Sequence, residues 1–304
     1  MQLHDIISSD QSAVHRALLN FKAAINRKGI WCPKDDIQFV FLCGANIDEK
    51  TPSKRRQDII DFSLHQIPHT KFFLAETIFN HLDGHNSNLL DIEHDLSSFS
   101  DYIIIVLESE SAFCELGAFA MKEELRRKLI VINDCEFKES KSFIKRGPID
   151  AIVESAGQER ILYYKMDKEG KLFGDRIGDI YRPLYDLINK VPNLRRRRAE
   201  NIDPTGSLTK NSLRFIFDLV YLMGPITAEE LSRIIKILFI KSADNKMKNL
   251  LAVLLAFQEV QKINTKYFVV AKERKLFYEY DFDCYLLKTA FKNMYYKYDK
   301  LRFE

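Results

Sequence analysis

Three carboxylates crowd one short segment, residues 108–117, which follows an apolar run and opens a helical pattern. Glu108 and Glu110 stand beside Ser109, a combination typical of a helix N-terminus, where such side chains satisfy free backbone amides. Glu115 lies one turn further along, where capping explains it less well. A carboxylate held there should be ionised and directed into a cleft. It would suit a nucleophile, or an anion that stabilises a developing oxocarbenium ion.

The residues around this segment alternate between strand and helix patterns. Mostly apolar runs predict buried strands, and helical spacing separates them, with strands at 37–43, 71–75, 102–107 and 128–132 and helices at 10–27, 53–65 and 111–127. Such alternation predicts right-handed crossovers and an α/β fold with a Rossmann-like or flavodoxin-like parallel sheet. Ligands bind such sheets beyond the carboxyl ends of the strands. We therefore expect the loop Gly44, Ala45 and Asn46, after the first strand, to contact substrate.

Several familiar motifs are missing from the sequence. It contains neither GxGxxG nor GxxxxGK[ST], so dehydrogenase-type dinucleotide binding and P-loop hydrolysis are not expected. The five cysteines are odd in number and have no CxxC pair, which predicts free thiols and a cytoplasmic location. No cysteine accompanies the histidines at ligand spacing, so no metal site is expected. No run approaches the ~20 apolar residues of a membrane span.

The net charge of +3 conceals two unlike parts. Residues 205–304 hold 17 Lys+Arg and 11 Asp+Glu, whereas the remainder holds 29 and 32. A charge run, Arg195, Arg196, Arg197 and Arg198, precedes a polar stretch with Pro and Gly, so we expect two domains, 1–200 and 205–304. The run is either a helix end that complements the helix dipole or a patch that contacts phosphates.

The basic part has helical spacing over 208–223, 228–239 and 244–260, then apolar runs at 263–270 and 276–279 around a charged turn. This order predicts a winged helix-turn-helix-like α+β domain. Its expected nucleic-acid contacts, besides the arginine run, are Lys246, Lys248, Lys272, Arg274 and Lys275. Tyrosines 285, 295, 296 and 298 of the last helix could stack on bases, although such stripes more often form a core or an interface. Winged helices also dock proteins, but the charge favours nucleic acid.

The segment from Ser109 to Phe119 resembles the active-site turn of the nucleoside 2-deoxyribosyltransferase family. That family shows a strand, an aspartate, a short Gly/Ser/Thr loop, and then glutamate, a hydrophobic residue, glycine and a small residue. Its glutamate attacks the anomeric carbon and displaces the base. The resemblance therefore implies that Glu115 is the catalytic residue.

The sequence also departs from that family's pattern. The family's strand-end aspartate falls at Ser109, and its upstream aspartate falls near Asp91, Glu93 or Asp95. The Gly44 loop corresponds to the family's first glycosyl-contacting loop. These departures argue against base exchange between deoxynucleosides and leave cleavage of an N-glycosidic bond as the chemistry.

A closer resemblance covers residues 115–119, 125–130, 141–144 and 147–148, which are similar to the effector protein of certain bacterial retrons. It implies an anti-phage toxin that cleaves the N-glycosidic bond of NAD or a related nucleotide and needs no cofactor. It implies a C-terminal winged-helix-like domain. It also implies restraint by the retron reverse transcriptase and its multicopy single-stranded DNA, with a higher-order assembly as one form of the complex. Arg146, before Gly147 and Pro148, is the candidate contact for a substrate phosphate, against simple surface charge.

Two functions of other classes remain open. One is a non-enzymatic nucleotide-sensing regulator that binds DNA, and the other is a metabolic nucleoside deoxyribosyltransferase. The second would have little use for a basic additional domain. Hydrolysis and glycosyl transfer both fit the expected chemistry.

Overall fold

The computed structural model describes residues 3–32, 37–48, 51–79, 96–167, 175–189, 197–206, 209–241, 244–271 and 275–303. The chain forms two compact units. Unit 1 comprises Met1–Lys34, Ile78–His85 and Asn193–Glu304, and unit 2 comprises Asp35–Thr77 and Asn86–Pro192. The first 34 residues therefore belong with the C-terminal part of the chain, and not with the α/β part in which the sequence analysis placed them.

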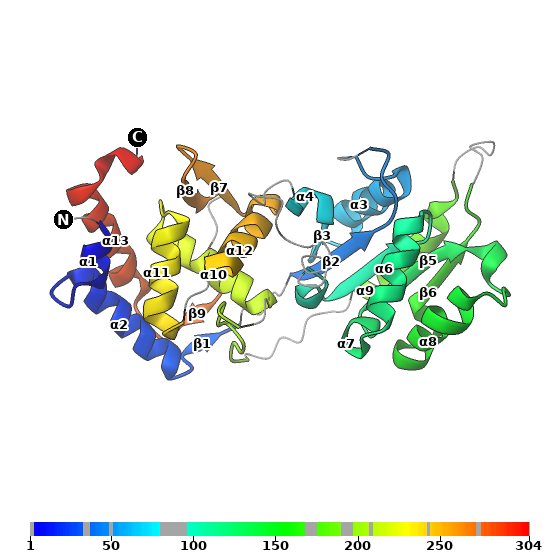
Figure 1. Ribbon diagram of the computed structural model, residues 1–304, viewed down its shortest axis with the longest axis horizontal. Coiled ribbons are helices and arrows are strands. Elements are labelled where there is room, and N and C mark those ends of the chain that lie inside the picture. The colour runs from blue at the N-terminus through cyan, green and yellow to red at the C-terminus, as the bar shows by residue number, and fades with distance from the viewer. Residues whose placement is uncertain are drawn as a thin grey trace. The chain divides into compact units, whose positions relative to one another are not determined.

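Unit 2 is built on a five-stranded parallel sheet (Figure 1). Its strands are β2 (Gln38–Cys43), β3 (Thr70–Phe73), β4 (Tyr102–Val106), β5 (Leu129–Asp134) and β6 (Ile161–Tyr164). Their order is β3-β2-β4-β5-β6, which is the flavodoxin-like order, so the predicted parallel α/β sheet is confirmed. The connections reverse direction between β2 and β4, and the carboxyl ends of these two strands are adjacent. Strand β6 was not predicted.

Helices and helical turns connect these strands. They are α3 (Lys54–Gln66), α4 (Ala75–Phe79), α6 (Glu110–Ala120), α7 (Glu123–Arg126), η1 (Cys135–Phe137), η2 (Lys145–Ile149), α8 (Asp150–Ala156), η3 (Gln158–Arg160), η4 (Ile177–Ile180) and α9 (Tyr181–Ile188). The single helix predicted over 111–127 is wrong, because the chain breaks into α6 and α7 at Met121 and Lys122. Among the described residues, no helix is both long and apolar enough to cross a bilayer.

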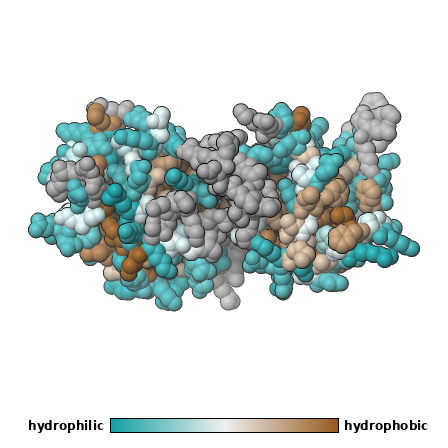
Figure 2. All heavy atoms as spheres, viewed as in Figure 1, coloured by the Kyte–Doolittle hydropathy of each residue, from teal (hydrophilic) through white to brown (hydrophobic). Residues whose placement is uncertain are grey.

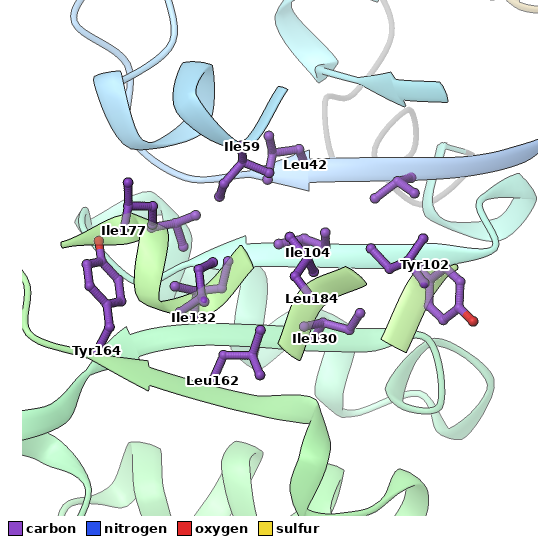
Figure 3. Packing of buried hydrophobic residues seen from close by; sticks show 14 of the residues in the cluster. Leu42, Ile59, Tyr102, Ile104, Ile130, Ile132, Leu162, Tyr164, Ile177 and Leu184 are labelled. Atoms are coloured by element: carbon purple, nitrogen blue, oxygen red, sulfur yellow. The ribbon is translucent and has the colours of Figure 1, made fainter. Parts of the chain in front are cut away.

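The core of unit 2 occupies both faces of the sheet. On one face, side chains such as Leu42, Ile104 and Ile132 pack with Ile59 of α3 and Leu184 of α9 (Figure 3). On the other, the ring of Phe41 stacks on Phe73 and lies 6.3 Å from Phe119 of α6. Because the strands are covered on both faces, they read as continuous apolar runs, and this explains why the sequence reveals them.

Unit 1 is mostly helical. Its elements are α1 (Leu3–Ser8), α2 (Ala13–Asn26), β1 (Ile30–Trp31), α10 (Lys210–Met223), α11 (Ala228–Phe239), α12 (Asp244–Ala256), β7 (Val260–Ile263), β8 (Tyr267–Val270), β9 (Glu279–Tyr280), α13 (Cys284–Tyr298) and η5 (Lys300–Phe303). The N-terminal residues join this unit because the apolar face of α2 packs on it. Phe21 is fully buried and its ring contacts the rings of Phe215, Tyr280 and Phe282. The edge strand β1 also pairs with β9.

The hairpin of unit 1 lies earlier in the chain than predicted. The run 263–270 is not one strand, since β7 and β8 pair with each other and turn at Asn264 and Thr265. Both turn residues have positive φ, +48° and +59°, which tight hairpin turns require. The described hairpin therefore has its tip between Ile263 and Tyr267, and not after residue 270 as predicted. Ile226, which precedes α11, forms a bridge with Phe268 and extends the hairpin.

Two buried charged groups hold unit 1 together. Arg302 is 1% exposed, and its guanidinium binds the carboxylates of Glu230 and Asp299 at 2.9 and 2.8 Å. Asp218 is fully buried and accepts hydrogen bonds from the backbone of Phe277 and Tyr278. Burial raises the pKa of Asp218 to about 7, although these hydrogen bonds oppose the shift.

This pKa makes the stability of unit 1 depend on pH. The folded state holds the proton of Asp218 up to about pH 7, whereas an unfolded aspartate releases it near pH ~3.9. The free energy of unfolding should therefore fall as the pH rises from about 4 to about 7. We expect the stability of wild type relative to Asp218→Asn to be lower at about pH 8 than at about pH 5. Urea unfolding followed by the fluorescence of Trp31, the single tryptophan, measures the free energy of unfolding of unit 1. An equal difference in this free energy between wild type and Asp218→Asn at both pH values would contradict the prediction.

Candidate functional site

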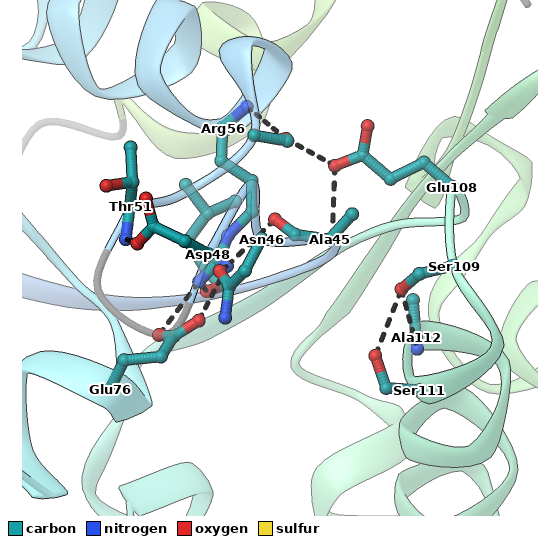
Figure 4. Close-up of polar contacts among 12 residues, drawn as sticks. Ala45, Asn46, Asp48, Thr51, Arg56, Glu76, Glu108, Ser109, Ser111 and Ala112 are labelled. Carbon is teal, nitrogen blue, oxygen red and sulfur yellow. Dashed lines mark hydrogen bonds and ion pairs between the residues drawn. The ribbon is translucent and has the colours of Figure 1, made fainter.

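The loops after β2 and β4 meet at the carboxyl edge of the unit 2 sheet (Figure 4). Gly44 has a φ of +155°, and a Cβ atom there would lie 2.9 Å from Cδ of Arg56 and 3.1 Å from Oε1 of Glu108. Only glycine allows so close an approach. The two loops that the sequence analysis singled out are therefore in direct contact.

Glu108 joins the two loops through its carboxylate. Its side chain is only 4% exposed, and it accepts hydrogen bonds from the backbone N of Ala45 at 3.1 Å and from the hydroxyl of Ser53. Arg55 binds the second oxygen at 2.9 Å, and its Nε binds Asp175. Burial opposes the charge of Arg55, but the hydrogen bonds to Glu108 and Asp175 outweigh this effect and raise its pKa. Arg55 should therefore remain charged throughout the physiological pH range.

Arg56 fixes the Gly44 loop from the opposite side. It is 1% exposed and donates to the carbonyl oxygens of Leu42 and Ala45, at 2.9 and 3.2 Å. It also binds the side-chain oxygen of Asn46 and both carboxylate oxygens of Glu76. Burial alone would raise the pKa of Glu76. The hydrogen bonds from Arg56 and its positive charge outweigh this effect, so the pKa of Glu76 is lowered. The oxygen of Asn46 is thus used to hold the loop.

Glu115 lies in the second turn of α6. Ser109 is the N-cap of this helix and accepts from the backbone N of Ala112, as predicted. The residues that α6 buries include Ala112, Leu116 and Phe119, and Glu115 borders this stripe at helical spacing. It is half-buried, and its Oε2 atom is shielded from solvent. The structure therefore directs one oxygen of the predicted catalytic carboxylate into the protein, on the helix that starts beside Glu108.

The surroundings of α6 include open space and an apolar cavity. A Cβ atom on Gly117 would meet no atom within 4 Å, so this glycine does not serve close helix packing. A cavity of about 240 Å³ is lined by residues that include Phe113, Phe137 and Ile144, and apolar side chains gather over α6 in Figure 2. Phe113 and Glu115 are two positions apart, about 200° around the helix. The cavity therefore lies away from the side of Glu115.

The structure does not bring the other two predicted substrate contacts, Asp91 and Arg146, to this site within the described residues. Asp91 lies outside the described residues. Arg146 is exposed on η2, and its described contacts do not include the Gly44 loop or Glu108.

Sequence reasoning missed the arginines that assemble the site. Arg55 and Arg56 begin α3, and Arg56 shares the buried face with Ile59 and Ser63 at positions i, i+3 and i+7. This spacing was the available signal. An arginine on an apolar face must be paired, and its partner Glu76 lies 20 residues further along.

A second candidate site is a groove in unit 1 between α12 and the hairpin. It has a volume of about 400 Å³, and its lining includes Lys248, Lys262 and Lys266, with Glu229 as the acidic member. Lys248 is exposed on α12. Lys262 lies on β7, before the predicted hairpin, and Lys266 lies in the turn before β8, within a segment that was predicted to be one strand.

The other predicted nucleic-acid contacts are distributed differently. Arg195, Arg196, Lys272 and Arg274, and the side chain of Lys246, lie outside the described residues. Lys275 is exposed but lies beyond the hairpin, so its placement in the wing was wrong.

Arg197 and Arg198 do not end a helix. Both follow α9 and run beside β1, where the guanidinium of Arg198 lies 5.3 Å from the ring centre of Trp31. The helix-end interpretation therefore does not hold for these two arginines.

Comparisons with known proteins show the family to which the chain belongs. The family described as "STM3845 retron effector protein" matches residues 52–262. An Escherichia coli protein named "Retron Ec73 putative ribosyltransferase/DNA-binding protein" is 39% identical over 303 residues, which cover 96% of this chain and 95% of that protein. A second, named "Retron Ec86 putative ribosyltransferase/DNA-binding protein", is 28% identical over 206 residues, or 66% of this chain and 65% of that protein. The chain therefore belongs to the retron effector family.

Proposed function

We propose that the chain is an N-glycosidase of the nucleoside deoxyribosyltransferase-like type that cleaves NAD or a related nucleotide. The observation that carries this proposal is the half-buried Glu115 in the second turn of α6, the helix that follows the loop where Gly44 and Glu108 meet. The relatives' names add a ribosyltransferase activity, which we extend to this chain.

In the proposed reaction, the bond between C1 of the ribose and the nitrogen of the base breaks, and the bonding electrons leave with the base. Glu115 attacks C1 or stabilises the oxocarbenium ion, and water then takes up the ribosyl group. A neutral base that leaves with two electrons needs a proton, whereas the cationic nicotinamide of NAD leaves as a neutral molecule. Position 109 holds a serine where the resembling family has an aspartate, and this change favours a substrate that needs no acid.

Unit 1 is proposed to be a winged-helix-like domain that binds nucleic acid. Three features support this proposal: the order α10, α11, α12 and hairpin, the bridge between Ile226 and Phe268, and the groove of three lysines. The relatives' names include DNA binding. We infer that this unit docks the reverse transcriptase and multicopy single-stranded DNA of a retron, which restrain the toxin in an anti-phage system.

The experiment that tests the activity uses the purified chain with NAD, ATP and deoxyadenosine plus free cytosine, and chromatography detects any released base. We expect nicotinamide and ADP-ribose from NAD. Base exchange on deoxyadenosine would instead identify a metabolic transferase. Binding without cleavage of any substrate would identify a regulator. In cells, induction of the chain alone should lower the NAD pool and stop growth, and co-expression of the retron partners should prevent both.

A further inference from the structure

The outer face of α13 combines cations and aromatic rings without an acidic residue. The helix contains three lysines and four tyrosines, and neither Asp nor Glu. Tyr295 is buried in the core, which agrees with the alternative that tyrosines of this helix form a core and do not stack on bases. Tyr285 and Tyr296 are 80% and 46% exposed, and they share one side of the helix with Lys288 and Lys292. The exposed tyrosines are therefore not core residues.

We call the row formed by Tyr285, Lys288, Lys292 and Tyr296 the stripe. A groove of about 430 Å³ opens at its N-terminal end. Its lining includes the rings of Tyr221, Phe277 and Tyr285, the cations Lys275 and Lys288, and the carboxylate Glu279. The ammonium of Lys288 lies 4.0 Å from the ring centre of Tyr221. Asp283 is also close, but its carboxylate caps α13 by accepting from the backbone N of Tyr285. Among the residues that line the groove, two lysines thus accompany one carboxylate, that of Glu279.

Aromatic rings that alternate with lysines suit single-stranded nucleic acid, because each unpaired base offers a face for stacking and each phosphate a charge. A duplex has its bases stacked already and gains nothing from Tyr285. We propose that this groove and the outer face of α13 bind a single strand. Tyr285 stacks on a base that enters the groove, and Lys288 and Lys292 contact the phosphates. The proposal rests on nucleic-acid binding by unit 1 and identifies the form of the ligand.

The dimensions of the helix set the length of the bound strand. Tyr285 and Tyr296 are 11 residues apart, about 16 Å along the axis. A stacked single strand advances about 3.4 Å per nucleotide, so the stripe covers about five nucleotides. The site is distinct in its residues from the lysine groove between α12 and the hairpin.

The test measures fluorescence anisotropy of the full chain with a labelled oligothymidine of about ten nucleotides and with a duplex of equal length. We expect Tyr285→Ala to weaken single-strand binding about tenfold and duplex binding much less. Tyr285→Phe, which keeps the stacking ring, should bind like wild type. The double substitution Lys288→Gln and Lys292→Gln should lower the slope of log affinity against log salt by about 1.4.

The matched control is Tyr298→Ala, an exposed tyrosine on the same helix but about 140° away from Tyr285. It should bind like wild type. Equal loss from Tyr298→Ala and Tyr285→Ala would overturn the proposal, and so would equal losses for single strand and duplex. If the stripe variants bind normally while Lys248→Ala, Lys262→Ala and Lys266→Ala together abolish binding, this inference fails and the proposed domain function stands. If wild type binds no nucleic acid, both fail.

Discussion

Replacing Glu115 by Gln should lower the rate of base release from NAD by several orders of magnitude. The amide has nearly the same size as the carboxylate, but it carries no negative charge and is a poor nucleophile. It can therefore neither attack C1 nor stabilise an oxocarbenium ion. Toxicity on induction and loss of the cellular NAD pool should disappear in the same variant.

The matched control is Glu110→Gln, the same chemical change in the exposed first turn of the same helix. It should leave the rate nearly unchanged, because Glu110 serves the helix N-terminus. Undiminished base release by Glu115→Gln would show that the assignment of the catalytic carboxylate is wrong. A rate that falls equally in both variants would point to the helix and not to the residue.

A second variant distinguishes the two roles of this carboxylate. Glu115→Gly leaves room for azide, which can replace a missing nucleophile at C1. If Glu115 forms a covalent ribosyl intermediate, azide should restore base release and appear in a ribosyl azide product. If Glu115 acts only as a charge, azide should leave the rate of the variant low.

The parts of this site that the sequence reveals are those with local causes. Strands β2 and β4 are continuous apolar runs, and the serine at 109 precedes a helical pattern. The rule for parallel sheets then brings the Gly44 loop beside the start of α6. Strand β6 was missed because four residues carry little periodicity, and its place is decided by pairing with β5, about thirty residues earlier.

The parts that the sequence hides depend on distant partners. The apolar face of α2 is visible locally, but the rings that cover Phe21 lie about 190 residues or more further along the chain. The hairpin error has a similar cause, since the apolar run over 263–270 contains a turn that only the positive φ of Asn264 and Thr265 discloses. The burial of charged residues is the hardest feature to predict, because an arginine whose acidic partner is distant in the sequence is taken as solvent-exposed.

Arg56 is the clearest example of a charged residue whose partner lies elsewhere in the chain. Its removal should have the largest effect on the stability of unit 2. We expect Arg56→Ala to lower the free energy of unfolding by about 3–5 kcal/mol. Glu76 would lose its cation, and the carbonyl oxygens of Leu42 and Ala45 would lose their donor inside the protein. Urea unfolding followed by circular dichroism, with hydrogen exchange in peptides that cover residues 38–48, measures the loss and localises it.

Lys54→Ala is the control, because Lys54 stands on the same helix with a side chain that is 80% exposed and forms a surface ion pair with Asp58. It should cost less than about 1 kcal/mol. In the double variant Arg56→Ala and Glu76→Ala, the loss should be smaller than the sum of the two single losses, since no buried charge is left alone. Additive losses, or an Arg56→Ala protein as stable as Lys54→Ala, would contradict the role given to Arg56. Where enough Arg56→Ala protein remains folded, its base release should still be low, because the Gly44 loop that faces Glu108 has lost its anchor.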